Sequence, residues 1–241
     1  MNSIFLLARR ELGAYLSTTW GYVILASVLL IDGLLFNAWA MGDSPRYSAE
    51  VLEEFFFVCS GTTMIAGILL TMRLIAEERQ TSTITLLDTA PISEGQIVLG
   101  KFLGAFAFLT IITLMTAYMP VLIQINGKIS GGQIAAGYLG LLSLGAASIA
   151  IGTLGSAMAR NQLLAAVLGG SMLGLMVIGW LTARLTEAPM SDILAYVAIF
   201  DRHFQPFMRG RINTESLIYY ASVTFIFLLL ATRALQARRH A

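Results

Sequence analysis

Six long apolar stretches, of which only the first is interrupted by a charged residue, constrain this chain more than any other feature. A helix rises about 1.5 Å per residue, so about 20 apolar residues cross the ~30 Å hydrocarbon core of a membrane. The sequence predicts six such spans, at about 21–41, 55–73, 102–125, 134–158, 162–183 and 216–233. We therefore expect an all-α, polytopic membrane protein with six transmembrane helices in a single domain, 1–241.

Composition supports the same class and excludes several others. Hydrophobic residues make up 57% of the chain and charged residues only 12%, too few polar side chains to cover a soluble fold of this size. The net charge of +1, with no basic tract, argues against nucleic acid as a partner. A single cysteine, Cys59, excludes a disulfide framework and a cysteine metal cluster.

The distribution of Lys and Arg predicts the orientation. With both termini inside, nine of these residues fall in inner segments and six in outer segments. The positive-inside rule therefore predicts cytoplasmic termini and a lipid bilayer as the surroundings of the spans. Ahead of the first span, apolar residues recur at helical spacing, which predicts an amphipathic helix lying in the membrane interface. These residues are Ile4, Phe5, Ala8, Leu12, Tyr15 and Leu16.

Two segments between spans are longer than a hairpin requires. The inner segment from Arg73 to Lys101 is polar and carries apolar residues that could contact a soluble partner, or it forms a helix on the membrane surface. The outer segment 184–215 contains an apolar run, Ile193–Phe200, that is too short to span. We expect that run to be interfacial or re-entrant.

No motif in the chain predicts catalysis. Gly95–Lys101 has the spacing of a phosphate-binding loop, but Phe102 stands where a hydroxyl should hold magnesium and no strand precedes it. An intramembrane protease needs histidines or other catalytic groups at membrane depth, and the only histidines are His203 and His240, outside the spans. Asp201 and His203 offer two metal ligands without a third. We expect no catalytic residues, no metal and no cofactor on this chain.

Asp32 is the one charged side chain at membrane depth. A carboxylate there is costly and usually faces a cavity, a partner or the protein interior. It could handle protons or substrate in a pathway, but a hydrogen-bonded structural aspartate is the interpretation we favour. Gly100-x-x-x-Gly104 and Gly170-x-x-x-Gly174 predict close helix packing rather than function.

The inner segment carries a recognisable motif. Glu77-Glu78-Arg79 is followed by Ser82-Thr83, Leu86-Leu87, Pro91-Ile92-Ser93 and Gly100-Lys101. This order resembles the membrane subunit (permease) of ABC-2 type exporters, with Ser82 where glycine is common. Arg10-Glu11-Leu12, Gly21-Tyr22-Val23, Tyr138–Leu142 and Arg160-Asn161-Gln162 agree with it along the chain. Asp201–Phe204, Arg209-Gly210 and Tyr219-Tyr220 resemble the gliding-motility-associated subfamily.

The resemblance implies a mechanism. Two permease subunits, identical or paralogous, would pair around a pathway, and each would dock a coupling helix onto a separate ABC ATPase that binds ATP and Mg. The residues implied in ATPase coupling are Glu77, Glu78, Arg79, Thr83, Leu86, Leu87, Pro91, Ile92 and Ser93, with Arg160 and Asn161 in a second inner turn. Asp201, Arg202, His203 and Arg209 would belong to short external helices that cap the exit.

The location that follows is the bacterial inner membrane, with both termini cytoplasmic. The substrate, and the need for a periplasmic or membrane auxiliary subunit, stay open. One alternative from another class also stays open: a membrane anchor or signalling scaffold that recruits a cytosolic partner through the same inner segment without transporting anything. A substrate-dependent ATPase rate would separate the two, because a scaffold has no reason to show one.

Overall fold

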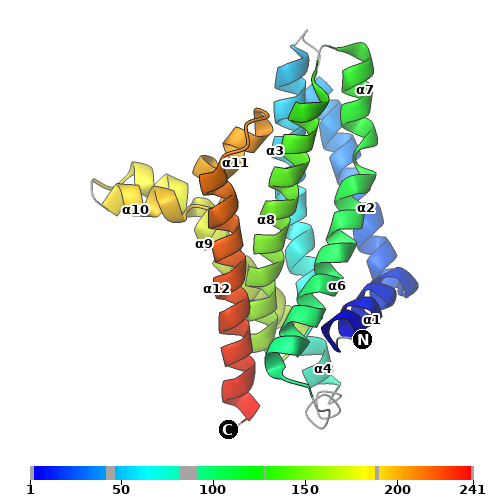
Figure 1. The fold of residues 1–241 in the computed structure, drawn as a ribbon, viewed down its shortest axis with the longest axis vertical. Helices are drawn as coiled ribbons and strands as arrows, with labels where there is room; N and C mark the ends of the chain where they lie inside the picture. Colours follow the sequence, from blue (N-terminus) through cyan, green and yellow to red (C-terminus); the bar gives the residue numbers. More distant parts are fainter. Residues whose placement is uncertain (1–2, 42–46, 82–91, 128, 188–189, 240–241) are drawn as a thin grey trace.

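The computed structural model describes residues 3–41, 47–81, 92–127, 129–187 and 190–239 of the chain. All regular elements in these ranges are helices. Six helical segments are long and apolar enough to cross a membrane, which confirms the predicted all-α polytopic fold. They run broadly along the long axis of the molecule (Figure 1). The segments are Thr19–Trp39, Ser48–Gln80, Glu94–Ile125, Gly131–Met158, Gln162–Gly179 and Thr214–Ala237.

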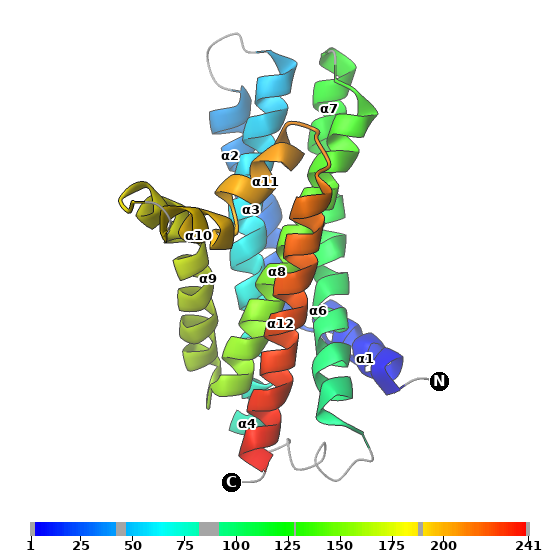
Figure 2. The ribbon, with the colours of Figure 1, turned by 60° about the vertical axis from the view of Figure 1, so that its left-hand side comes forward.

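The N-terminal helix α1 (Ser3–Ser17) confirms the expected helix ahead of the first span. It packs against α6 near the end of the bundle that carries α4 and the C-terminus, called the inner end below (Figures 1 and 2). Its apolar residues divide between two directions: Leu7 and Tyr15 are buried against the bundle, whereas Phe5 and Leu16 stay exposed. The helix therefore offers one face to the protein and leaves another for lipid.

The first two spans are longer than their charge-free stretches. Helix α2 (Thr19–Leu35) continues as a π-helical segment, η1 (Phe36–Met41), and α3 (Ser48–Thr71) begins seven residues before the predicted span. The extra turns of α3 hold Glu50, Glu53 and Glu54, and acidic residues are favourable near a helix N-terminus. An apolar stretch marks only the part of a helix that lies at membrane depth, so it underestimates the length of the whole helix. A short helix, α4 (Ala76–Gln80), follows α3 at the inner end.

The third span is broken, which the sequence reading of 102–125 as one continuous segment did not anticipate. Helix α6 (Glu94–Met115) starts eight residues earlier and ends before a turn that leads into α7 (Tyr118–Asn126). Pro120 explains the break: its ring clashes with the carbonyl four residues earlier, at Thr116, and it offers no N–H. At the other end, the side chain of Ser93 caps α6 by accepting from the Gln96 amide, in a reciprocal capping box.

Helix α8 (Gly131–Met158) lies in the middle of the bundle. It contacts α3, α6, α9 and α12, and most of its inner half is buried. A tight turn at 159–161 connects it to α9 (Gln162–Arg184), as the short gap between the predicted spans 134–158 and 162–183 requires. The two helices touch at glycines: a Cβ at Gly155 would stand 2.6 Å from the backbone nitrogen of Gly169. In contrast, a Cβ at Gly170 or Gly174 would meet nothing within 4 Å, so that predicted packing motif has no neighbour within the described part of the chain.

Two short helices precede the last span, as expected for the outer segment. Helix α10 (Met190–Val197) lies across the bundle axis, and α11 (Asp201–Met208) leads toward α12 (Thr214–Arg239) (Figure 2). Two tyrosines of α12 hold the linker between them: Tyr219 Oη donates to the Val197 carbonyl (2.6 Å) and Tyr220 Oη to the Ile199 carbonyl (2.8 Å). These two hydrogen bonds fasten the short helices to the spanning helix α12. The short helices lie away from α4, toward the opposite end of the bundle, which is called the outer end below (Figure 1).

Candidate functional site

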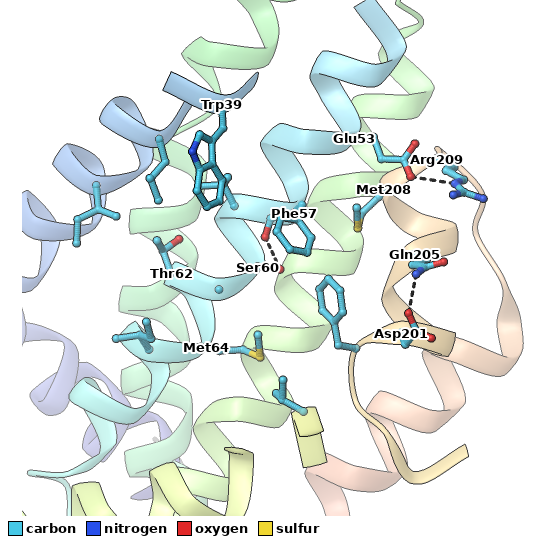
Figure 3. Close-up of a pocket in the computed structure, with 17 residues that line it drawn as sticks. Trp39, Glu53, Phe57, Ser60, Thr62, Met64, Asp201, Gln205, Met208 and Arg209 are labelled. Atoms are coloured by element: carbon cyan, nitrogen blue, oxygen red, sulfur yellow. Dashed lines mark hydrogen bonds and ion pairs between the residues drawn. The ribbon is translucent and has the colours of Figure 1, made fainter. Parts of the chain in front are cut away.

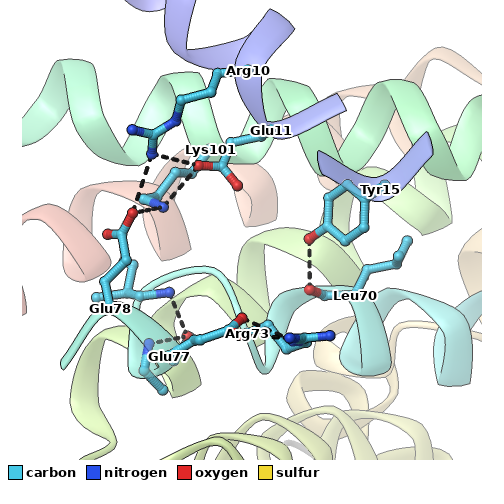
Figure 4. A network of polar contacts seen from close by, with 11 residues as sticks. Arg10, Glu11, Tyr15, Leu70, Arg73, Glu77, Glu78 and Lys101 are labelled. Carbon is cyan, nitrogen blue, oxygen red and sulfur yellow. Dashed lines mark hydrogen bonds and ion pairs between the residues drawn. The ribbon is translucent and has the colours of Figure 1, made fainter. Parts of the chain in front are cut away.

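A network of charges joins three helices at the inner end (Figure 4). Lys101 of α6 is only 1% exposed, and its Nζ lies 3.0 Å from Glu11 Oε1 of α1 and 2.8 Å from Glu78 Oε1 of α4. Arg10 Nη2 contacts the same two carboxylate oxygens, at 2.9 and 3.2 Å. Two cations therefore alternate with two carboxylates, and each buried charge faces one of opposite sign.

Two glycines of α6 allow α1 to come close enough for this network. A Cβ at Gly100 would stand 2.6 Å from Leu7 Cβ, and one at Gly104 would stand 2.5 Å from Glu11 Cβ. The predicted Gly100-x-x-x-Gly104 motif thus packs α6 against the interfacial helix. It brings the Glu11 backbone within reach of Lys101, which lies between the two glycines in sequence.

The electrostatics of Glu11 follow from the same arrangement. Burial by itself raises the pKa of Glu11, but Lys101 and Arg10 outweigh it and hold this pKa below its ordinary value of 4.5. The Glu11 carboxylate is therefore ionised near neutral pH and acts as a fixed negative partner for Lys101.

Helix α4 is fixed to the bundle from its other side. The Ser156 hydroxyl of α8 accepts from the backbone amides of Ile75 (3.0 Å) and Ala76 (3.1 Å), at the start of α4. Arg79 Nη1 donates to the Ala159 carbonyl in the α8–α9 turn, at 3.0 Å. Glu77 pairs with Arg73 one turn earlier. Ser156 and the Glu77–Arg79 motif thus connect α4 to α8, to the α8–α9 turn, to α1 and α6, and to the turn after α3.

The second predicted coupling element lies beside α4. Asn161 caps α9, its Oδ1 accepting from the Leu164 amide at 2.8 Å, and Arg160 next to it is exposed. A shallow hollow of about 440 Å³ separates the two elements and is lined from both sides, by Gln80 of α4 and by Asn161. The structure thus brings together the two inner elements that the sequence places about 80 residues apart.

Part of the predicted coupling segment lies outside the described residues. Thr83, Leu86, Leu87 and Pro91 belong to that part. Ile92 and Ser93 follow it at the start of α6, where Ser93 serves as the helix cap described above.

The predicted external residues divide between two places. Asp201 and Arg209 line a groove of about 580 Å³ between α2–η1, α3, α9 and α11 (Figure 3). Arg209 Nε pairs with Glu53 at 3.0 Å, and Asp201 accepts from Gln205 at 2.7 Å. The other two point away from this groove, because Arg202 pairs with Glu215 and the His203 ring stacks on Tyr219 at 3.7 Å.

The His203 ring is buried among aromatic side chains. Its side chain is 1% exposed, and Nε2 lies 3.0 Å from the Tyr196 carbonyl, so this nitrogen carries the proton. Burial lowers the pKa of His203 from its ordinary value. No group of three metal-ligating side chains occurs within the described residues, and His203 packs as an aromatic residue between α11 and α12.

Asp32 lies inside the bundle and not in the groove. It is 2% exposed, and its Oδ1 accepts a hydrogen bond from Thr62 Oγ1 at 2.7 Å. It borders a small internal cavity of about 10 Å³ together with Cys59 and Thr116. Thr62 itself lines the groove, so one threonine stands between the carboxylate and that open space.

The sequence reading missed the part played by Lys101, Glu11 and Arg10. From the sequence, Lys101 was placed only at the end of the inner segment and of the family motif, whereas the structure buries it in the third turn of α6. The available signal was its place between two helix-packing glycines, which points a lysine near a helix contact rather than toward lipid headgroups.

A comparison with protein families matches residues 16–178, more than half of the chain, to a family described as "ABC-2 family transporter protein". The match runs from the end of α1 through most of α9, so it includes α4, the turn at 159–161 and Lys101. No curated protein matched the chain in a sequence search.

Proposed function

Because the chain belongs to the ABC-2 family of transporter proteins, we propose that it is the membrane subunit of an ATP-driven exporter and docks onto its ATPase through the inner end. Members of this family are membrane transport subunits and generally work with an ABC ATPase as partner. The six apolar helices agree with a multi-pass permease. In this proposal ATP and Mg bind the partner chain, and this chain converts the partner's movement into transport.

One observation carries the docking proposal: α4 and the turn between α8 and α9 lie together at the inner end. Arg79 connects them directly through the Ala159 carbonyl. The exposed hollow between Gln80 and Asn161 gives a partner access to both elements at once. A soluble subunit that binds there would push on α4 and on the start of α9 in the same step.

The charge network extends this contact to the interfacial helix. Glu78 of α4 and Glu11 of α1 share the buried ammonium of Lys101. A displacement of α4 would separate buried opposite charges unless α1 and α6 moved with it. We infer that α1, α4 and the start of α6 move as one unit during the transport cycle.

The remaining parts of the proposal rest on the resemblance of the sequence. Two permease subunits, identical or paralogous, would form the pathway in the bacterial inner membrane. Both termini would be cytoplasmic, in keeping with α1 and the end of α12 lying at the same end of the bundle as α4, which belongs to the predicted coupling segment (Figure 1). The outer residues Asp201–Phe204 further support a place in the gliding-motility-associated branch.

Co-purification tests the docking proposal. The full chain is expressed with the ABC ATPase encoded nearest to it and isolated in mild detergent with ATP present. We expect the ATPase to co-purify with the native chain and to be lost from Leu87→Asp, because a carboxylate at a predicted apolar contact opposes docking. Leu185→Asp is the matched control, since Leu185 is 83% exposed beyond the far end of α9.

Two results would contradict the proposal. Equal loss of the ATPase from both variants would mean that the inner segment holds no specific contact. Absence of an ATPase from the native complex would favour the scaffold, and a cytosolic protein that is not an ATPase would then be expected in its place.

A further inference from the structure

A wide groove lies at the outer end of the bundle, between α2–η1, α3, α9 and α11. Its volume of about 580 Å³ lies within the range of sites for one small ligand. One wall comes from α2–η1 and α3, and the other from α9 and α11. Figure 3 shows the labelled polar groups of the α11 side, Asp201, Gln205 and Arg209, opposite Trp39.

The floor of the groove is apolar and opens toward the membrane. Ile31, Phe57 and Ile65 line it and are 43, 45 and 63% exposed. They belong to helices that are long and apolar enough to cross the bilayer, and in the single chain their exposed faces are open to lipid tails. A hydrocarbon chain can therefore enter sideways from the bilayer without passing through water. Gly61 leaves room for it, because a Cβ there would meet nothing within 4 Å.

The mouth of the groove is acidic. A neighbouring hollow of about 300 Å³ shares Glu53, Phe57 and Met208 with the groove and adds Glu50 and Glu54. The described residues that line the two hollows carry four carboxylates and one guanidinium. Arg209 is paired with Glu53, whereas Glu50 and Glu54 have no ion-pair partner among the described residues. Among the described residues, the mouth thus carries a net negative charge above an apolar floor.

These two properties together specify one kind of occupant. We propose that the groove binds an amphiphile with a cationic headgroup, whose tail lies along Phe57, Gly61 and Ile65 and whose head lies at Glu50 and Glu54. This inference rests on the proposed export function, for which it names the substrate class. An anionic head would meet like charges at the mouth, and a fully polar solute would leave the apolar floor uncovered. Trp39, 56% exposed at the end of the first span, is typical of the interfacial depth at which such a head lies.

Photolabelling of the purified full chain in lipid nanodiscs tests the proposal. The probe is a dodecyl trimethylammonium ion with a diazirine in its tail, and its match is the same tail with a sulfate head. We expect the cationic probe to label residues 57–65 of α3. An excess of unlabelled dodecyltrimethylammonium should compete with the probe and abolish this labelling. Labelling of that segment by the sulfate probe should be weaker by a factor of about five or more, because its negative head is repelled by the carboxylates at the mouth.

Two pairs of variants assign the head and the tail. Glu50→Gln with Glu54→Gln should remove the preference for the cationic probe, whereas Glu187→Gln with Asp192→Asn, at outer acids that do not line the groove, should keep it. Gly61→Leu should fill the floor and reduce labelling by both probes. Gly170→Leu is its control, since a Cβ there also meets nothing within 4 Å and the residue lies outside the groove.

Three results would overturn the proposal. They are equal labelling of residues 57–65 by both probes, unchanged labelling of Gly61→Leu, and a second copy of the chain in the groove. The last is detected as a disulfide-linked dimer of Ile65→Cys that the cationic amphiphile does not prevent. No ATPase is present in these measurements, so failure here leaves the docking proposal standing, and failure of co-purification leaves binding in the groove standing.

Discussion

At the scale of single residues, Lys101 is a buried cation that pairs with two carboxylates from different helices. Its ammonium is buried between Glu11 and Glu78, and Arg10 alone cannot neutralise both carboxylates if Lys101 is removed. We predict that Lys101→Met lowers the free energy of unfolding by about 3 kcal/mol, because removing one partner leaves buried charge uncompensated. Thermal unfolding of the purified chain measures the loss.

The exposed pair Arg202–Glu215 supplies the control for that prediction. Both side chains are about half exposed, at 52 and 53%, and water screens their attraction. Arg202→Met should change the stability by less than about 1 kcal/mol, since exposed pairs contribute little. If the two variants lost equal amounts of unfolding free energy, the network at Lys101 would contribute no more stability than an exposed ion pair.

At the scale of elements, hydroxyl groups of α12 fasten the short outer helices. Tyr220 is 1% exposed and donates to the Ile199 carbonyl between α10 and α11. We predict that Tyr220→Phe costs about 1–3 kcal/mol, because it leaves a buried carbonyl without its donor. Amide hydrogen exchange should accelerate at residues 194–204 and stay unchanged in the inner half of α8. Tyr22→Phe, at a side chain 58% exposed, is the matched control and should alter neither quantity.

How far the elements could be predicted depends on what the sequence encodes locally. Long apolar stretches predict six spans because a helix satisfies its own backbone hydrogen bonds in lipid, and the described residues form six helical segments long and apolar enough to cross. The predicted spans place the starts of α3 and α6 too late in the chain, because the first turns of these helices carry acidic residues that lie beyond membrane depth. The break near Thr116 was within reach of the sequence, because Pro120 encodes it locally.

Contacts between distant elements were beyond the sequence. Glu11, Glu78 and Lys101 meet across separations of 90 and 23 residues, and no periodicity within one helix reports such a meeting. The inner motif was recognised by its likeness to a family, but the role of its charges in fixing α4 to α1 and α6 required the fold. The groove likewise depends on α3 and α11 lying together, where Glu53 and Arg209 are 156 residues apart.

At the scale of the whole molecule, α9 connects the proposed ATPase-docking region at the inner end with the proposed binding groove at the outer end. It begins at Asn161 beside α4 and carries Val177 in the wall of the outer groove. Its path is set by close packing on α8, where a Cβ at Gly155 would stand 2.6 and 2.8 Å from the backbone of Gly169. Backbone atoms cannot yield as a flexible side chain does, so this contact positions the whole helix.

Gly155→Leu tests whether α9 links the two ends. The added side chain should force α9 away from α8 and lower the free energy of unfolding by about 1–3 kcal/mol or more, as overpacking does. We predict that co-purification of the ATPase and labelling of the groove fall together in this variant. Gly170→Leu, on the same helix with open space around it, should retain both. Loss at one end with the other end intact would mean that α9 does not transmit between them, and that α3, which also reaches both ends, does so instead.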